Sequence, residues 1–256
     1  MELLHLNPEE ERFADRVDDL FALCREKNIV RFSSFLDERQ QKIAQMVSLR
    51  YPESVFRFFG GYENAQRQML GVFPEYLAPD EGEFPLVGVT ATFRKADHPT
   101  HRDFLGALMA LKIKREAIGD LVVIPPESKA VIFLSQPVVP LVLDELQKVG
   151  RIGIQLQIGV PQRLTRQEQF QLISGTVLSP RLDAVLAVVL PLSREKVSQL
   201  ITQGKVAVNH EETFRATVHL KQGDLLSVRG FGRFQLESFG AVSKKGRIHI
   251  TCKKFV

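Results

Sequence analysis

Residues 179–209 read SPRLDAVLAVVLPLSREKVSQLITQGKVAVN, and their pattern is the clearest indication of the fold of the C-terminal third of the chain. It predicts a first short helix that begins at Pro180, with Ser179 as its N-cap and leucine and valine on its buried face. Ser193 caps a second short helix. Gly204 then allows the left-handed backbone that ends this helix before a strand. The pattern is that of two short helices leading directly into a β-strand.

The residues after this stretch predict the rest of a small sheet. A strand over residues 205–208 turns at Asn209 and His210. Two further turn sequences, residues 223–224 and 244–246, are rich in glycine and polar residues. We expect later strands over residues 225–229, 233–239 and 247–255. Residues 177–256 are therefore predicted to form one α+β module.

The net charge of +4 is unevenly distributed along the 256 residues. From Val177 onward there are 13 Lys and Arg residues and 6 Asp and Glu residues, a net charge of +7, so the preceding residues carry −3. The basic side chains alternate with core-type apolar positions, which is not the pattern of a solubilising tail. This asymmetry favours a polyanionic partner, with nucleic acid ahead of membrane.

Basic and polar side chains gather where the two helices begin and where the first strand starts. The amide groups and dipoles of helix N-termini favour anions, and adjacent guanidinium groups strengthen such a site. Arginine can also stack on exposed bases. We therefore predict phosphate contacts here. The residues expected to point outward are Arg181, Arg194, Lys196, Gln199, Lys205 and Asn209.

Residues 1–80 are predicted to form a helical N-terminal region. Apolar residues at three- and four-residue spacings indicate a helix over residues 8–28. Further helices are expected over residues 37–50 and 63–70, with a short strand over residues 55–59. The acidic start of this region makes it a candidate docking site for a protein partner.

Residues 81–160 show strand and helix patterns in the order β-α-β-β-α-β, which is the ferredoxin-like arrangement. The expected strands are 84–93, 120–124, 130–134 and 151–158, and the expected helices are 103–113 and 138–149. RNA-recognition domains share this order with many unrelated proteins. Their aromatic strand signature is missing, because the third strand holds a single Phe. RNA binding by the sheet face is left open. Residues 161–176 are expected to be a linker.

The C-terminal pattern resembles the RNA-binding domain named after ribosomal protein S4, also called the αL motif. The resemblance extends from Ser179 to about Gly232 and rests on R-L-D, S-R, a hydrophobic pair, G-x-V-x-V-N and G-D. It implies that Asp183 braces arginine side chains. The RNA-binding residues that this resemblance implies are Arg181, Ser193, Arg194, Lys196, Gln199, Lys205 and Asn209. We also assign Arg229, beside Gly230, to the RNA-binding set.

The order of the domains resembles that of the YlmH family of bacterial proteins. Residues 93–106, FRKADHPTHRDFLG, are similar to that family's central signature. The resemblance spans essentially the full length. It implies binding to ribosomal RNA and tRNA on the large ribosomal subunit, in rescue or quality control of stalled translation, and an association with cell division.

Basic residues also flank the helix expected in the central domain. They could form a second RNA or ribosome contact, or they could be an ordinary solvated helix face, and both interpretations stay open. The candidates for a second RNA contact are Arg94, Lys95, Arg102, Lys114 and Arg115.

An RNA-modifying enzyme is the alternative function, because this kind of module often accompanies pseudouridine synthases and other modifying enzymes. Arg181-Leu182-Asp183 imitates the catalytic Asp motif of those synthases but belongs to the binding module itself. Neither Gly60-Gly61 nor residues 150–153 supply the glycine-rich cofactor loop of a methyltransferase. We therefore predict no catalytic residues and no cofactor.

Metal binding, disulfides and membrane insertion are not indicated by the sequence. His98 and His101 have no third ligand nearby, and Cys24 and Cys252 are far apart in the chain. No apolar run reaches the length of a bilayer span, and no basic segment leads into an apolar signal core. We expect a cytoplasmic protein without a metal site.

Overall fold

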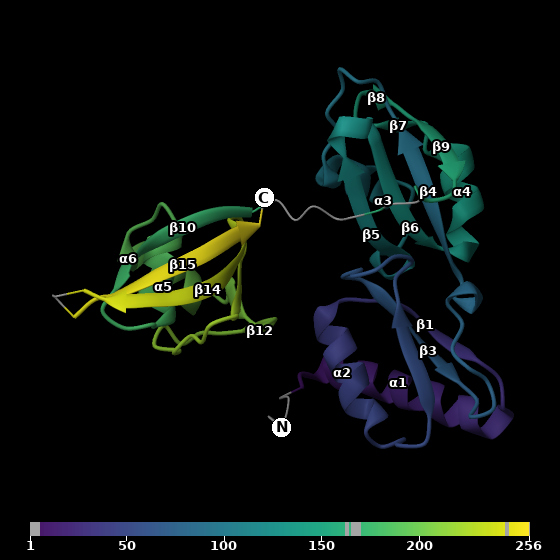
Figure 1. Ribbon diagram of the computed structural model, residues 1–256, viewed down its shortest axis with the longest axis horizontal. Helices are drawn as coiled ribbons and strands as arrows, with labels where there is room; N and C mark the ends of the chain where they lie inside the picture. Colours follow the sequence, from purple (N-terminus) through teal and green to yellow (C-terminus); the bar gives the residue numbers. More distant parts are fainter. Residues whose placement is uncertain (1–5, 162–163, 165–169, 244–245, 256) are drawn as a thin grey trace. The chain divides into compact units, whose positions relative to one another are not determined.

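The computed structural model describes residues 6–161, 164, 170–243 and 246–255. The chain divides into two compact units, Met1–Arg166 and Gln167–Val256 (Figure 1). Both units combine helices and sheets around hydrophobic cores of their own, so the α+β class predicted from the sequence is confirmed.

The N-terminal unit begins with two helices packed on an antiparallel three-stranded sheet of order β1-β3-β2. The elements are α1 (Pro8–Lys27), β1 (Arg31–Leu36), α2 (Glu38–Ser48), β2 (Val55–Phe59) and β3 (Gln68–Phe73). Capping boxes at Asn7 and Asp37 satisfy backbone amides at the start of each helix. Apolar residues of both helices, including Phe21 and Ile43, pack on Leu70 and Val72 of β3 and bury one face of this sheet.

The sequence prediction for this region is wrong in two places. The helix expected over residues 63–70 is absent, because residues 68–73 form β3, the central strand of the sheet. Leu70 and Val72 face the helices, whereas Met69 and Phe73 belong to a second core. A strand buried on both faces has a continuous apolar run, which a helix can also produce. The short strand β1 was not expected at all.

The remainder of this unit has the predicted ferredoxin-like connectivity. Its main elements are β4 (Leu86–Thr92), α3 (His101–Ala110), β5 (Ile118–Ile124), β6 (Lys129–Ser135), α4 (Val139–Glu145) and β9 (Gln155–Ile158). The strands form an antiparallel sheet of order β5-β6-β4-β9, and the helices pack on one face through residues such as Phe104 and Val142 (Figure 1). Short 3-10 turns precede or connect these elements: η1 (Glu81–Glu83), η2 (Arg115–Ala117), η3 (Pro125–Glu127) and η4 (Gln136–Val138).

The last helix and strand of this domain differ from the prediction. The helix expected over residues 138–149 ends at Glu145, where Leu146 leaves the helical conformation. A small hairpin of β7 (Lys148–Val149) and β8 (Ile152–Gly153) follows, with Gly150 at positive φ in its turn. The strand expected over residues 151–158 is thus divided between β8 and β9.

The second face of the central sheet is covered by the N-terminal elements over β5 and β6. Phe133 is fully buried in a core that includes Phe35 and Phe73, and its ring stacks on Tyr62 at 5.1 Å. Asp120 on β5 accepts hydrogen bonds from the Tyr62 hydroxyl and from the backbone amides of Gln66 and Arg67 in the loop between β2 and β3. This part of the sheet face is therefore closed to RNA.

The C-terminal unit is a mixed module in which α5 and α6 pack on one face of a six-stranded antiparallel sheet of order β10-β15-β14-β13-β11-β12 (Figure 1). Its elements are β10 (Phe170–Val177), α5 (Leu182–Val189), α6 (Arg194–Thr202), β11 (Val206–Val208), β12 (Glu211–Glu212), β13 (Leu225–Val228), β14 (Gly232–Val242) and β15 (Ile248–Phe255). The expected linker over residues 161–176 needs correction, because β10 begins at Phe170 and pairs with β15 along its whole length.

Candidate RNA interface

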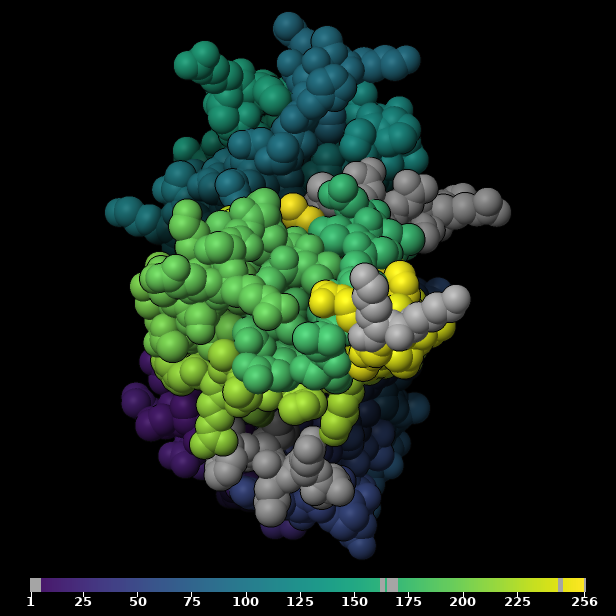
Figure 2. Space-filling view, turned by 90° about the vertical axis from the view of Figure 1, so that its left-hand side faces the viewer, coloured from purple at the N-terminus to yellow at the C-terminus, as the bar shows by residue number. Residues whose placement is uncertain are grey.

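The two helices of the C-terminal unit owe their position to a shared apolar core. Leu182, Val185 and Leu186 of α5 and Val197 and Ile201 of α6 are buried against the sheet. The polar residues of both helices are consequently left on the surface. Figure 2 shows the C-terminal unit in green to yellow, with the segment around α6 forming part of its exposed surface.

The start of α5 differs from the sequence prediction. Arg181, not Ser179, occupies the N-cap position, and its side chain forms no cap hydrogen bond. The amides of Leu182 and Asp183 donate to the carbonyls of Val218 and Ala216, at 2.8 and 3.1 Å. Two N-terminal amides of α5 are therefore occupied by backbone. These two amides are not available to the predicted anion site, so phosphate binding at this point would depend mainly on side chains.

Arg181 is held by the carboxylate that follows it on α5. Its Nε and Nη2 atoms donate to Oδ1 and Oδ2 of Asp183, each at 3.0 Å. The Arg181 side chain remains 39% exposed. Asp183 thus braces an arginine, as the S4 resemblance implies. A guanidinium fixed in this way keeps further N–H donors for an outside acceptor.

The start of α6 agrees with the prediction. Ser193 caps the helix by accepting a hydrogen bond from the Lys196 amide at 3.4 Å. Arg194, Lys196 and Gln199 are all exposed. Glu195 is exposed in the same turn, so this helix start carries one acidic group beside its two cations. Among the described residues, neither cation has an ion-pair partner.

Lys205 and Arg229 lie side by side although they are distant in sequence. The Arg229 amide donates to the Lys205 carbonyl at 2.9 Å, next to the paired strand residues Val206 and Val228. Both side chains are exposed. Within the described part of the chain neither forms an ion pair. The structure therefore brings two predicted RNA-binding residues together as free cations.

Asn209 has a structural task that the sequence pattern did not reveal. It adopts a left-handed conformation with φ of 50°. Its Oδ1 accepts a hydrogen bond from the Leu225 amide at 3.0 Å, and its Nδ2 donates to Oδ1 of Asp224 at 2.9 Å. The side chain is exposed, but it ties the turn between β11 and β12 to the start of β13. Asn209 therefore has a structural role, and an RNA contact by this exposed side chain stays a prediction.

Phe214 is a candidate that the sequence pattern does not predict. It is 61% exposed, an unusual fraction for a phenylalanine. A Cβ atom on Gly204 would lie 3.0 Å from the Phe214 ring, so the ring rests directly on this glycine. The Thr213 amide donates to the Val206 carbonyl, so residue 213 lies along one edge of β11. Arg229, whose amide bonds to Lys205, lies along the opposite edge of the same strand. The signal in the sequence is Gly204 itself, whose missing side chain makes room for the ring.

The second predicted contact, in the central domain, is divided by the structure. Arg94, Lys95 and Arg102 are exposed near the start of α3. Lys114 is also exposed, and its Nζ lies 3.9 Å from Oε1 of Glu116. Arg115 instead turns inward, where its Nη1 donates to the carbonyl of Ile118 at 2.7 Å, and its burial lowers the pKa of its guanidinium. Arg115 is therefore removed from the candidate RNA contact.

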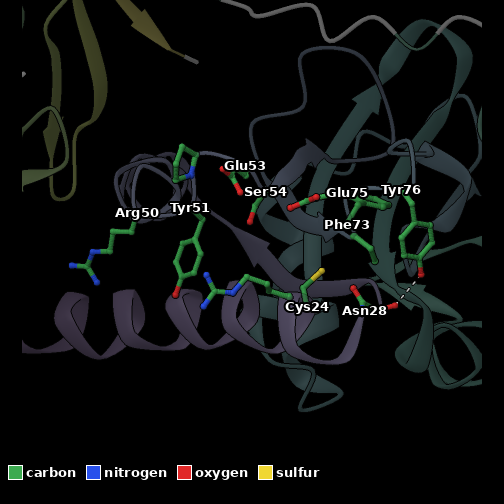
Figure 3. Close-up of a pocket in the computed structure, with 12 residues that line it drawn as sticks. Cys24, Asn28, Arg50, Tyr51, Glu53, Ser54, Phe73, Glu75 and Tyr76 are labelled. Carbon is green, nitrogen blue, oxygen red and sulfur yellow. Dashed lines mark hydrogen bonds between the residues drawn. The ribbon is translucent and has the colours of Figure 1, made fainter.

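A hollow of about 500 Å³ lies in the N-terminal unit near the end of α1 (Figure 3). Its described lining includes two arginines and two glutamates but no histidine. The thiol of Cys24 donates to the Val72 carbonyl at 3.4 Å, and burial raises its pKa. Tyr76 closes one end by donating to the Asn28 carbonyl at 3.0 Å. The hollow thus lacks an activated nucleophile with a neighbouring base.

Two further findings concern the described residues as a whole. They contain no group of three or more His, Cys, Asp or Glu side chains that could hold a metal ion. None of their helices is both long enough and apolar enough to cross a membrane.

Comparisons with known proteins agree with this architecture. The sequence matches a family model described as "Putative RNA-binding domain in YlmH" over residues 79–160 and the S4 domain over residues 180–225. It is 30% identical over 252 residues to the "Ribosome-associated protein quality control protein P2" of Bacillus subtilis (strain 168). The aligned region covers 98% of this chain and 97% of that protein. None of these descriptions is that of an enzyme.

A solved structure adds evidence on the fold. The "Cell division protein ylmH from Streptococcus pneumoniae" superposes with a TM-score of 0.53 at 22% identity, covering 62% of this chain and 96% of that one. At this identity the likeness concerns the fold alone. The near-full-length relative and the two family domains, in the order that the sequence predicts, establish that the chain belongs to the YlmH family of RNA-binding, ribosome-associated proteins.

Proposed function

We propose that the protein binds ribosomal RNA and tRNA on the large ribosomal subunit and acts, without catalysing a reaction, in rescue or quality control of stalled translation in the cytoplasm. The observation that carries this proposal is the set of exposed cations without ion-pair partners in the C-terminal unit, within a family of ribosome-associated proteins. The printed name of the relative from Bacillus subtilis supports the quality-control role. The printed name of the structural neighbour supports a link to cell division.

The mode of binding follows from the side chains at this surface. Arg181, Arg194, Lys196, Lys205 and Arg229 would contact phosphates, which sets affinity and orientation. Ser193 and Gln199 would add hydrogen bonds from α6. Phe214 would stack on an unpaired base beside the Lys205–Arg229 pair, as aromatic residues do when proteins grip RNA loops. The exposed group Arg94, Lys95, Arg102 and Lys114 would provide the second contact.

Cross-linking followed by sequencing of the bound RNA from cells tests this function. The proposal predicts ribosomal RNA of the large subunit and tRNA as the enriched species, and their loss when Lys205 and Arg229 are both replaced by Gln. Enrichment of messenger RNA or small-subunit RNA alone would contradict it. Purified protein that modifies bases in bulk ribosomal RNA would overturn the non-catalytic part. A protein partner at the acidic N-terminal helices is tested separately. Such a partner should co-purify with the wild-type chain and be lost from a variant in which the acidic residues of α1 are replaced.

A further inference from the structure

The sheet of the C-terminal unit has a second face, opposite α5 and α6, that carries aromatic and basic residues. Along β10, Ile173 and Val177 point toward the helices, so Phe170 and Leu172 point the other way. Phe170 pairs with Phe255 of β15, and Leu172 pairs with Lys253. Directly opposite residues of an antiparallel pair share a face. Phe170 and Leu172 are 45% and 58% exposed.

Two cations lie over the aromatic rings of this face. The Lys253 ammonium is 5.0 Å from the centre of the Phe170 ring, and the Arg233 guanidinium is 5.5 Å from the centre of the Phe255 ring. Glu237 fixes Lys253 through an ion pair of 2.7 Å. We name Phe170, Leu172, Arg233, Lys253 and Phe255 the aromatic–basic patch.

The composition of the patch indicates which ligand it fits. Surfaces that bind single-stranded nucleic acid combine aromatic rings, on which bases stack, with cations that follow the backbone phosphates. Each base offers a π-face, so such binding tolerates different sequences. The cores of protein–protein interfaces are instead depleted in Lys. The net charge of +7 from Val177 onward also favours a polyanion.

From this geometry we infer that the aromatic–basic patch is a second RNA-binding face, which takes unpaired nucleotides by stacking on Phe170 and Phe255. The inference rests on the proposed RNA-binding function and adds a separate site for a separate class of RNA. The surface of α5, α6 and the Lys205–Arg229 pair would hold structured RNA. The patch would hold an adjacent unpaired segment, so that one module grips both parts of the same molecule.

The chain contains no tryptophan, which permits a direct test with the full-length protein. Phe170→Trp places a single tryptophan in the patch, and Phe214→Trp places one at the Lys205–Arg229 edge. Each variant is titrated with an unstructured RNA of about 12 nucleotides and, separately, with folded tRNA. The affinity of the double variant Phe170→Leu, Phe255→Leu for both RNAs is measured beside that of Lys205→Gln, Arg229→Gln. Leucine keeps apolar packing on the exposed face, and thermal unfolding checks the fold of each variant.

The proposal predicts that the unstructured RNA quenches the tryptophan of Phe170→Trp with saturation. The leucine double variant should bind this RNA roughly tenfold more weakly, the effect of losing stacking on an aromatic ring, and keep its affinity for tRNA. Loss of tRNA binding only in Lys205→Gln, Arg229→Gln would confirm that the two faces act separately. Unchanged fluorescence and unchanged affinity for the unstructured RNA would overturn the second face. A blue-shifted emission of Phe170→Trp that no RNA alters would also overturn it, because a protein surface would then cover the patch. If both double variants keep their affinity for tRNA, the proposed function is contradicted, whereas the second face is not.

Discussion

Arg181 donates two hydrogen bonds of 3.0 Å to the carboxylate of Asp183, which lies two residues further on in the first turn of α5. The amides of this helix start are already taken by the backbone of residues 216 and 218. The positive charge at α5 is therefore presented by a side chain that a carboxylate holds in place. This arrangement replaces a helix-dipole site by a braced guanidinium.

The brace predicts that Arg181 and Asp183 are energetically coupled in RNA binding. Arg181→Ala should weaken RNA binding about tenfold, the effect of one charge-assisted hydrogen bond. In an Asp183→Asn background the same change should cost about threefold or less, because a loosely held guanidinium loses more rotamer entropy on binding. The double-mutant cycle is read from filter-binding affinities at one salt concentration. Equal losses in both backgrounds would show that Asp183 does not position Arg181.

The contact between Gly204 and Phe214 predicts a substitution that affects both stability and RNA binding. Gly204 has φ of 66°, and a Cβ atom there would meet the Phe214 ring at 3.0 Å. Gly204→Ala should lower the free energy of unfolding by about 1 kcal/mol and weaken RNA binding by displacing the ring. Gly223→Ala is the matched control, since Gly223 has φ of 91° but no atom within 4 Å of its Cβ position. The control should lose stability and keep RNA affinity; an equal loss of affinity in both variants would exclude the ring contact.

The hydrogen bonds of Asp120 are expected to stabilise the packing of the N-terminal elements on the central sheet. The Asp120 carboxylate is buried and accepts from the Tyr62 hydroxyl and the amides of Gln66 and Arg67. Asp120→Asn should lower the free energy of unfolding by about 3 kcal/mol, because donors that pointed at a carboxylate are left without a charged acceptor. Urea unfolding of the full chain measures the change. Asp18→Asn, which alters an exposed ion pair with Arg50, should cost about 0–1 kcal/mol. A comparable loss in the two variants would contradict the buried-acceptor role.

The ion pair between Glu10 and Arg39 predicts a pH dependence of stability. The hydrogen bond from the Arg39 guanidinium lowers the pKa of the Glu10 carboxyl below its ordinary value. A carboxyl whose pKa is lower in the folded state stabilises the fold above its unfolded pKa of about 4.3, and loses that contribution as the pH falls through the folded pKa. Thermal unfolding between about pH 6 and pH 3 should therefore depend less steeply on pH in Glu10→Gln than in the wild-type chain. Glu9→Gln, which removes an exposed carboxyl without an Arg39 contact, serves as the control. Parallel profiles for Glu10→Gln and the wild-type chain would contradict the prediction.

The parts of the fold that the sequence predicts well are those with local signals. In the C-terminal unit, Ser193 marks the start of α6 as its N-cap, and Gly204 marks the end of that helix by its positive φ. The strands show a two-residue alternation of apolar residues. The order of elements in the central domain is predictable for the same reason. Where the sequence prediction fails, as in β3, a long-range contact overrides the local pattern, because that strand is buried on both faces.

In the candidate site, too, features with local signals are predictable from the sequence, whereas those that depend on long-range contacts are not. The exposure of Arg194, Lys196 and Lys205 follows from the spacing of their apolar neighbours. The N-cap of α5 could not be predicted, because the amides at its start are satisfied by residues more than thirty positions later in the chain. The inward turn of Arg115 and the turn-bracing role of Asn209 likewise depend on carbonyls and amides that only the folded chain brings near.

The salt dependence of RNA binding tests whether free cations on the C-terminal unit contact phosphates. The test variant replaces Arg194, Lys196, Lys205 and Arg229 with Gln; the control replaces Arg12, Arg16, Lys27 and Lys42 of the N-terminal helices and changes the net charge equally. We predict that the slope of log affinity against log salt falls by about 3 units in the test variant, from the per-phosphate counterion rule, and stays unchanged in the control. The same slope in the test variant and the wild-type chain, with the fold intact, would contradict it.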